Sequence, residues 1–119
     1  MALLSKQQIH DADASLPFED VPVPQWGGEV RIVGLSGKEV TAFQTSRQKT
    51  GPDGKPFIDQ TNIMADLVSR TMRDANNELV YTVAEIEQLG AKSGMALTNL
   101  FNVAQRLSGL IEQKELEKN

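Results

Sequence analysis

A valine–proline alternation, VPVP at positions 21–24, constrains what this chain can fold into more than any other stretch of the sequence. Alternation with a period of two is typical of an extended strand. Proline has no backbone N–H, so Pro22 and Pro24 leave one edge of that strand without donors, while the valines keep theirs for a partner on the other edge. The segment is therefore predicted to be an edge strand that is protected against unwanted pairing.

The partner of this strand follows directly in the sequence. Residues 29–33 (EVRIV) place Val30 and Ile32 on one face of a second predicted strand. The pair Gly27-Gly28 supplies the positive φ angles that tight hairpin turns need. We expect a β-hairpin over residues 18–33, with Trp26, the only tryptophan, at its turn.

The hairpin is followed by two predicted helices with a long loop between them. A capping box, SGKE, predicts a helix over residues 37–47, and an apolar stripe at i, i+4 spacing predicts another over residues 60–73. Residues 48–58 contain two glycines, two prolines and a Pro-Asp-Gly turn signal. We expect a flexible loop there, with Phe57 and Ile58 returning its far end to the core.

Two further helices are predicted in the last third of the chain. A second capping box, TVAE at 82–85, opens a short helix that ends near Leu89, and residues 79–81 before it are a candidate third strand. The last helix begins near residue 93 and carries the best apolar face in the protein, which we expect to be central to the core. That face consists of Leu97, Leu100, Phe101, Ala104 and Leu107.

These elements predict a single α+β domain, predominantly helical, in which an N-terminal β-hairpin packs on a small bundle of about four helices. Residues 1–16 contain little periodic order and are expected to be a mobile N-terminal segment. The domain is expected to span residues 17–109. Residues 110–119 are expected to form a short helix or a frayed tail. A chain of 119 residues can build a modest core without a disulfide or a metal.

The composition limits the class of protein. With no cysteine, neither a disulfide framework nor a thiolate metal site is expected. No run approaches the roughly 18 apolar residues of a membrane span, and the first six residues lack the features of a signal peptide. A net charge of −4 with scattered basic residues disfavours nucleic acid as a partner. We expect a cytosolic protein that binds neither membrane nor nucleic acid.

The sequence contains no recognisable catalytic or cofactor-binding constellation. His10 is the only histidine and lies in the predicted mobile segment, which disfavours a histidine-based triad or metal site. The segment GLSGK at 34–38 departs from a P-loop, because Ile32 replaces the first glycine and Glu39 follows the lysine. We expect a protein that is not an enzyme and holds no metal and no cofactor.

Five residues are candidates for partner binding: Trp26, Met64, Met72, Leu110 and Ile111. A tryptophan at a hairpin tip either packs on the domain's own core or anchors a partner, because aromatic side chains dominate both small cores and interfaces. Methionines on a helix stripe present the same two alternatives. The sequence leaves core and interface open for these side chains.

Three segments of the chain together resemble the tail assembly chaperones of long-tailed bacteriophages. They are DVPVPQWGGEVR at 20–31, GKEV at 37–40 and LFNVAQRLS at 100–108. The similarity extends from about residue 18 to residue 119, and none of its segments is a catalytic signature.

The resemblance implies a non-enzymatic phage protein of the host cytoplasm that is absent from the mature virion. Its implied partners are the tape measure protein, the tail tube protein, which it would help to recruit during tail morphogenesis, and further copies of itself. The alternative is a small structural phage protein, such as a head–tail joining or tail-completion subunit. The two differ in one observable, because a structural subunit remains in purified virions.

Overall fold

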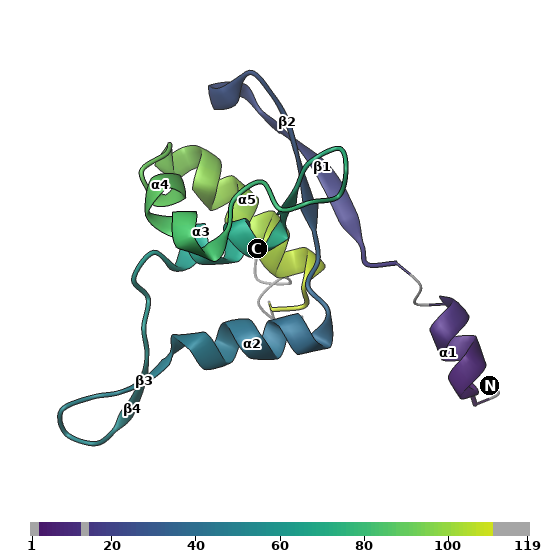
Figure 1. Cartoon of the computed structure of the whole chain (residues 1–119), viewed down its shortest axis with the longest axis horizontal. Helices are drawn as coiled ribbons and strands as arrows, with labels where there is room; N and C mark the ends of the chain where they lie inside the picture. Colours follow the sequence, from purple (N-terminus) through teal and green to yellow (C-terminus); the bar gives the residue numbers. More distant parts are fainter. Residues whose placement is uncertain (1–2, 13–14, 111–119) are drawn as a thin grey trace, which may run out of the picture.

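The computed structural model describes residues 3–12 and 15–110. Figure 1 shows an α+β arrangement, as predicted, with a small antiparallel sheet beside a predominantly helical body. The β1–β2 hairpin lies on one side of helices α3 (Ile63–Thr71), α4 (Ile86–Gly90) and α5 (Gly94–Leu107), and helix α2 (Gly37–Arg47) lies on the other side. None of the helices in the described part of the chain has the length and apolar character to cross a membrane.

The predicted hairpin is confirmed. Strand β1 (Phe18–Val23) pairs antiparallel with β2 (Gly28–Val33), in the register that sets Val21 opposite Val30. A 3-10 turn, η1 (Pro24–Trp26), joins them, and of the two glycines only Gly27 has a positive φ, 75°. The strand order β1-β2-β5 leaves β1 at an edge of the sheet, as its prolines predict.

The third strand differs from the prediction. It is β5 (Met72–Arg73), which pairs with Ile32 and Arg31 of β2, whereas residues 79–81 contribute only an isolated bridge between Leu79 and Arg73. Because Met72 and Arg73 join the sheet, helix α3 (Ile63–Thr71) is shorter than the predicted 60–73. Its N-cap is Asn62, which takes a left-handed conformation.

Helix α5 (Gly94–Leu107) is central to the core, as predicted. The Ser93 hydroxyl accepts from the Ala96 N–H and caps it, and the helix packs on α3, β1 and β2. Of its predicted face, Leu97, Leu100 and Ala104 are buried, whereas Phe101 and Leu107 are only partly buried. Ala96 and Val103 of α5 are buried as well, and the other buried apolar residues come from the sheet, α2, α3, α4 and Leu35 after β2.

A close approach fixes the end of β2 against α5. A Cβ atom at Gly34 would collide with the backbone carbonyl of Leu107, so only glycine fits here. The Leu35 N–H also donates to the Ser108 hydroxyl at 2.9 Å. These contacts join the hairpin to the C-terminal end of the last helix.

The second capping box is confirmed, but its helix begins as a 3-10 turn. Thr82 and Glu85 form the box around η2 (Val83–Glu85), and α4 (Ile86–Gly90) follows. Leu89 is fully buried, whereas Val83 is exposed. Helix α4 packs against α3 and covers one end of the core.

Helix α2 (Gly37–Arg47) begins at the predicted Ser36–Glu39 capping box and has the predicted bounds. Phe43 is its buried residue and Val40 packs partly buried against the core, whereas the other residues of the helix are polar or exposed. A helix with so little apolar area needs other attachments to the domain. Arg47 at its C-terminus supplies one, with an ion pair to Asp66 of α3.

Residues 48–58, predicted as a flexible loop without regular structure, contain two short strands, and their flexibility remains a prediction. Strands β3 (Gln48–Thr50) and β4 (Pro56–Ile58) form a second hairpin, closed by the Pro-Asp-Gly turn. We call it the β3–β4 arm, since it extends beyond the end of α2 (Figure 1). Phe57 and Ile58 are half exposed and do not return to the core, because they belong to an outlying two-stranded ribbon with no helix over it.

The N-terminal segment contains a helix, which the sequence analysis did not predict. Helix α1 (Lys6–Ala12) has a reciprocal cap, in which the Gln8 N–H donates to the Ser5 hydroxyl and the Ser5 N–H donates to the Gln8 side chain. It buries no residue. The predicted mobility of residues 1–16 and the domain limits remain predictions, and residues 111–119 lie outside the part described.

Candidate partner-binding site

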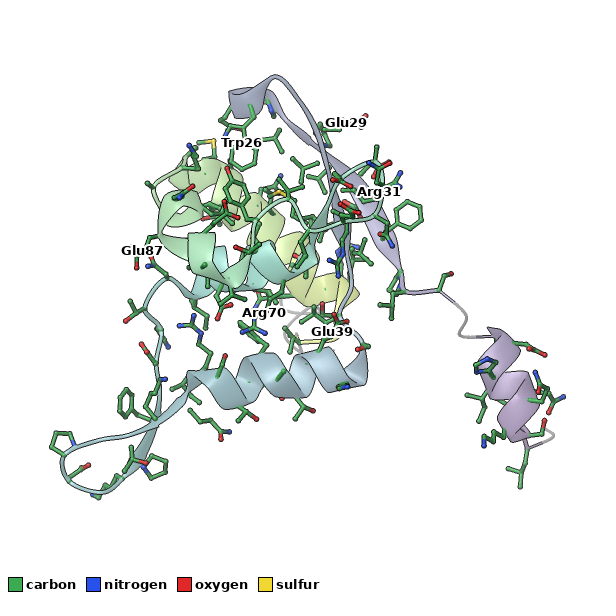
Figure 2. All side chains as sticks on the ribbon, viewed as in Figure 1. Trp26, Glu29, Arg31, Glu39, Arg70 and Glu87 are labelled. Carbon is green, nitrogen blue, oxygen red and sulfur yellow. The ribbon has the colours of Figure 1, made fainter. Side chains whose placement is uncertain are left out.

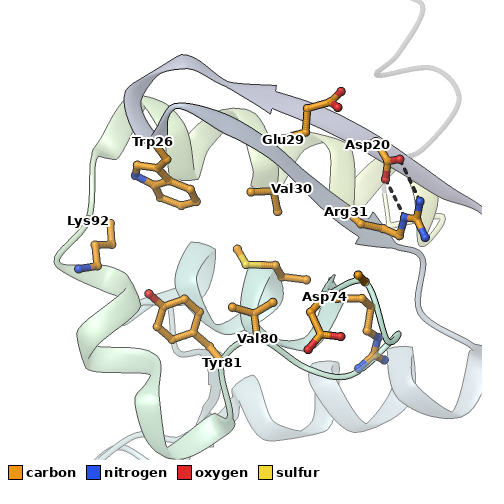
Figure 3. Close-up of a pocket in the computed structure, with 12 residues that line it drawn as sticks. Asp20, Trp26, Glu29, Val30, Arg31, Asp74, Val80, Tyr81 and Lys92 are labelled. Atoms are coloured by element: carbon orange, nitrogen blue, oxygen red, sulfur yellow. Dashed lines mark hydrogen bonds and ion pairs between the residues drawn. The ribbon is translucent and has the colours of Figure 1, made fainter.

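A concave site lies between β2 and the segment that runs from β5 to Tyr81 (Figure 3). It is an open pocket of about 780 Å³, which we call the Trp26 pocket. Its apolar lining consists of Trp26, Val30, Met72, Ala75, Val80 and Tyr81. Its polar lining consists of Asp20, Glu29, Arg31, Arg73, Asp74 and Lys92.

The two aromatic side chains lie on opposite sides of the pocket. Figure 3 shows Trp26 on the hairpin side and Tyr81 across from it, with Val30 and Val80 farther along. The η1 turn and Gly27 hold Trp26 at the hairpin tip, where it remains 37% exposed. Trp26 thus has a partly buried ring with enough free surface to contact a partner.

A short hydrogen-bonded turn positions the opposite wall. The Asp74 carboxylate accepts from the backbone N–H groups of Asn76 and Glu78, at 2.8 and 3.0 Å. Asn77 takes the left-handed conformation, with φ 63°, so the chain reverses and returns towards the sheet. The Val80 N–H then donates to the Met72 carbonyl at 3.3 Å, which places Val80 beside the pocket.

An ion pair forms one end of the pocket. Arg31 of β2 donates to both carboxylate oxygens of Asp20 on β1, with Nε–Oδ1 at 2.7 Å and Nη2–Oδ2 at 3.0 Å (Figure 3). These hydrogen bonds lower the pKa of Asp20 and raise that of Arg31. The Arg31 guanidinium also lies 4.6 Å from the centre of the Phe18 ring. The pair is exposed to solvent, so it contributes little to stability.

The five predicted partner-binding residues fall in different places. Trp26 and Met72 both line the Trp26 pocket, although Met72 is 3% exposed and also belongs to the core. Met64 lies between α3 and α5, where its sulfur is 3.6 Å from the Thr98 hydroxyl. Leu110 packs against the core, and Ile111 lies outside the described residues.

Tyr81, Val80 and Val30 are pocket residues that the sequence analysis did not single out. From the sequence, residues 79–81 are predicted to be a strand because they form a short apolar run. The Asp74-Ala-Asn-Asn turn before them was the available signal, since it implies that the following residues double back onto β5. Their position opposite Trp26 depends on that reversal.

Two of the carboxylates that line the Trp26 pocket already have partners within the chain. Asp20 is engaged by Arg31, and Asp74 holds its own turn. His10 lies on α1, away from this site (Figure 2). Within residues 3–12 and 15–110, no three histidine or carboxylate side chains are grouped so that they could hold a metal ion. The pocket can bury apolar side chains between two aromatic rings, with charges of both signs at its rim.

No protein-family model matches the chain, and no curated protein matches it either. A solved structure of the bacteriophage HK97 tail assembly chaperone does match, with a TM-score of 0.56 and 22% sequence identity. The match covers 87% of this chain and 98% of the HK97 chain. The predicted resemblance is thus confirmed at the level of structure, and this chain has the fold of a bacteriophage tail assembly chaperone.

Proposed function

We propose that this protein is a phage tail assembly chaperone. The observation that carries the proposal is its likeness to the HK97 chaperone over nearly all of that chain. The three segments of sequence resemblance, at 20–31, 37–40 and 100–108, support the same function. In this proposal the protein works in the host cytoplasm and is absent from the mature virion.

The proposed client is the tape measure protein of the same phage, bound while the tail tube protein is recruited around it. The Trp26 pocket is the proposed contact. Its volume of about 780 Å³ accommodates several aliphatic or aromatic side chains, such as those on one face of a helix. Trp26, Tyr81 and Val80 would bury apolar area of the client, and the charges around them would orient it.

Co-expression with the tape measure protein tests this function. We expect the client to stay soluble with this chain and to precipitate without it. The complex should persist at about 0.5 M salt, since screening weakens exposed ion pairs while burial of apolar area persists. Equal precipitation with and without the chain would contradict the proposal.

A matched pair of variants tests the contact. Trp26→Ala removes the largest side chain of the Trp26 pocket, and we expect the soluble fraction of the client to fall at least threefold. Phe57→Ala removes an aromatic ring that is 50% exposed on the β3–β4 arm, and we expect no change. Both variants are first checked for an unchanged circular dichroism spectrum. Equal losses in both, or no loss in Trp26→Ala, would exclude the Trp26 pocket as the client site.

The composition of purified virions separates the chaperone from the alternative structural subunit. A chaperone is released, so mass spectrometry of the particles should detect this chain at far below one copy per tail ring. Recovery in fixed stoichiometry with the tail proteins would instead favour a head–tail joining or tail-completion subunit.

A further inference from the structure

One surface patch of the molecule is lined by uncharged residues only. Residues 93–105 contain no ionisable side chain, although 24% of the whole chain is charged. This helix surface adjoins the proline-bearing edge strand, and together they line a second pocket of about 580 Å³. Its lining residues, which we call the uncharged face, are Pro22, Val23, Pro24, Gln25, Gly94, Met95, Ala96, Thr98, Asn99 and Asn102.

The exposed part of α5 on this face is a regular stripe. Met95, Thr98, Asn99 and Asn102 are spaced i, i+3, i+4 and i+7, so they form one continuous ridge along the helix. All four are exposed, and Met95 is 74% exposed. The buried stripe of α5 is a different one, with Leu97, Leu100 and Ala104, so packing of the domain's own core does not account for the exposed ridge.

The chemistry of the uncharged face fits a second copy of the same chain. In a two-fold contact each residue meets residues of the same surface, so a face rich in one charge would repel itself. Asn, Gln and Thr each carry a donor and an acceptor, and are therefore complementary to themselves. Each copy also has a net charge of −4, which favours contact through a surface without charge. Interface centres are depleted of charged residues for the same reason.

The edge strand restricts how two copies meet. Pro22 and Pro24 lack the N–H groups that pairing of β1 with another strand would require. The copies must then pack through side chains, with α5 as the main ridge. In an antiparallel crossing centred between Thr98 and Asn99, Met95 lies opposite Asn102 of the second copy, and Thr98 lies opposite its Asn99.

We propose that the uncharged face is the self-association surface of this protein, with two copies packed about a two-fold axis through α5. This inference rests on the self-association that belongs to the proposed chaperone function, and it names the surface. Polar asparagines on such a helix ridge also fix the register of the two helices. The Trp26 pocket lies on other residues and stays available to the client.

Sedimentation equilibrium of the full chain tests the surface. We expect a dimer whose dissociation constant is unchanged or lower at 0.5 M than at 0.05 M salt, because screening reduces only the repulsion between the acidic copies. Asn99→Asp places like charges near the axis and should raise the dissociation constant at least tenfold. Gln44→Glu, an exposed change of the same charge on α2, should leave it unaltered. Met95→Asp is a second variant on the ridge, and it should likewise raise the dissociation constant at least tenfold.

A charge-reversal pair distinguishes local contact from net charge. Asn99→Lys makes each copy less negative, yet it should also weaken the dimer because it places two positive charges near the axis. An equimolar mixture of Asn99→Lys and Asn99→Asp should restore association. A monomeric wild-type chain at about 100 μM, or equal dimerisation of Asn99→Asp, Met95→Asp and wild type, would overturn the proposal. The client-solubility assay is independent of this dimerisation experiment. Its failure would contradict the chaperone function without contradicting a measured dimer.

Discussion

Asp66 is the residue that attaches a polar helix to an apolar core. It is 2% exposed, and it accepts from Arg47 Nε of α2 and Arg70 Nε of its own helix, each at 2.8 Å. Arg47 also donates to the backbone carbonyls of Asp59 and Thr61, so one guanidinium joins α2, the chain after the β3–β4 arm and α3. Figure 2 shows Arg70 pointing from α3 towards α2, and it lies 5.6 Å from the Phe43 ring.

Removing this carboxylate should destabilise the fold. Asp66→Ala leaves two arginines without their shared partner, and we expect a loss of about 3 kcal/mol in the free energy of unfolding. The matched change Asp20→Ala removes an acidic partner of an exposed arginine and should leave the melting temperature nearly unchanged. Urea unfolding of both variants measures the difference. Equal stability of the two would mean that the buried pair contributes no more than the surface pair.

Two neighbouring residues of α5 should differ in their contribution to stability. Leu100 is fully buried, so Leu100→Ala should cost about 3 kcal/mol by loss of apolar burial and creation of a cavity. Phe101 is only partly buried, so part of its ring is already hydrated and Phe101→Ala should cost less, although it removes more atoms. The same denaturation experiment ranks the two, and a larger loss for Phe101→Ala would contradict the burial seen here.

The β3–β4 arm is the element least supported by the rest of the domain. Each strand has three residues, and a two-stranded ribbon is marginally stable in isolation. Its base is held by Arg47, whose carbonyl accepts from the Asp59 N–H at 2.6 Å. The base is therefore fixed while the tip depends on its own short ladder.

Trypsin should cut this arm at one place. Lys49 is exposed on β3, Arg47 is engaged by Asp66 and two carbonyls, and Lys55 is followed by Pro56, which blocks cleavage. Within residues 15–110 we therefore expect the first cut after Lys49, identified by mass spectrometry of the early fragments. Lys49→Gln should remove it. Earlier cleavage after Lys38 or Lys92, both exposed outside the arm, would show that the arm is better ordered than its strands imply.

The molecule as a whole is more extended than its length requires. The radius of gyration of its Cα atoms is 16.3 Å, against about 13.5 Å for a compact domain of 119 residues. Helix α1 and the β3–β4 arm contribute to this extension, since both project from the helical body in Figure 1. Elements that project in this way add surface for contacts with other chains at little cost to the core.

Deleting residues 1–14 should leave the domain intact. Helix α1 buries no residue, so we expect the melting temperature to change by less than about 2 °C, where a loss of 1 kcal/mol would change it by about 4 °C or more. Differential scanning calorimetry of the shortened chain measures this. A fall of more than about 5 °C would place α1 against the domain in solution.

Local chemistry was enough to predict several elements from the sequence. The Ser36 and Thr82 capping boxes, the start of α5 near residue 93 and the valine–proline hairpin lie where the sequence placed them, because each depends on residues within a few positions of one another. The buried stripe of α5 followed from its period for the same reason. The α+β class and the edge position of β1 were therefore readable without the structure.

Contacts between distant residues decided much of the rest. Met72 and Arg73 belong to a helical pattern, yet pairing with β2 satisfies their backbone groups and ends α3 early. Residues 48–58 contain turn formers, and cross-strand bonds make them a hairpin. The Trp26 pocket exists because the turn at Asp74 brings Tyr81 opposite Trp26. The β3–β4 pairing is local, since Thr50 pairs with Pro56 across the Pro-Asp-Gly turn, and its turn signal was present in the sequence. The pairing of β5 and the Trp26 pocket depend on partners far away in the chain, which local preferences do not specify, so only the tertiary structure determined them.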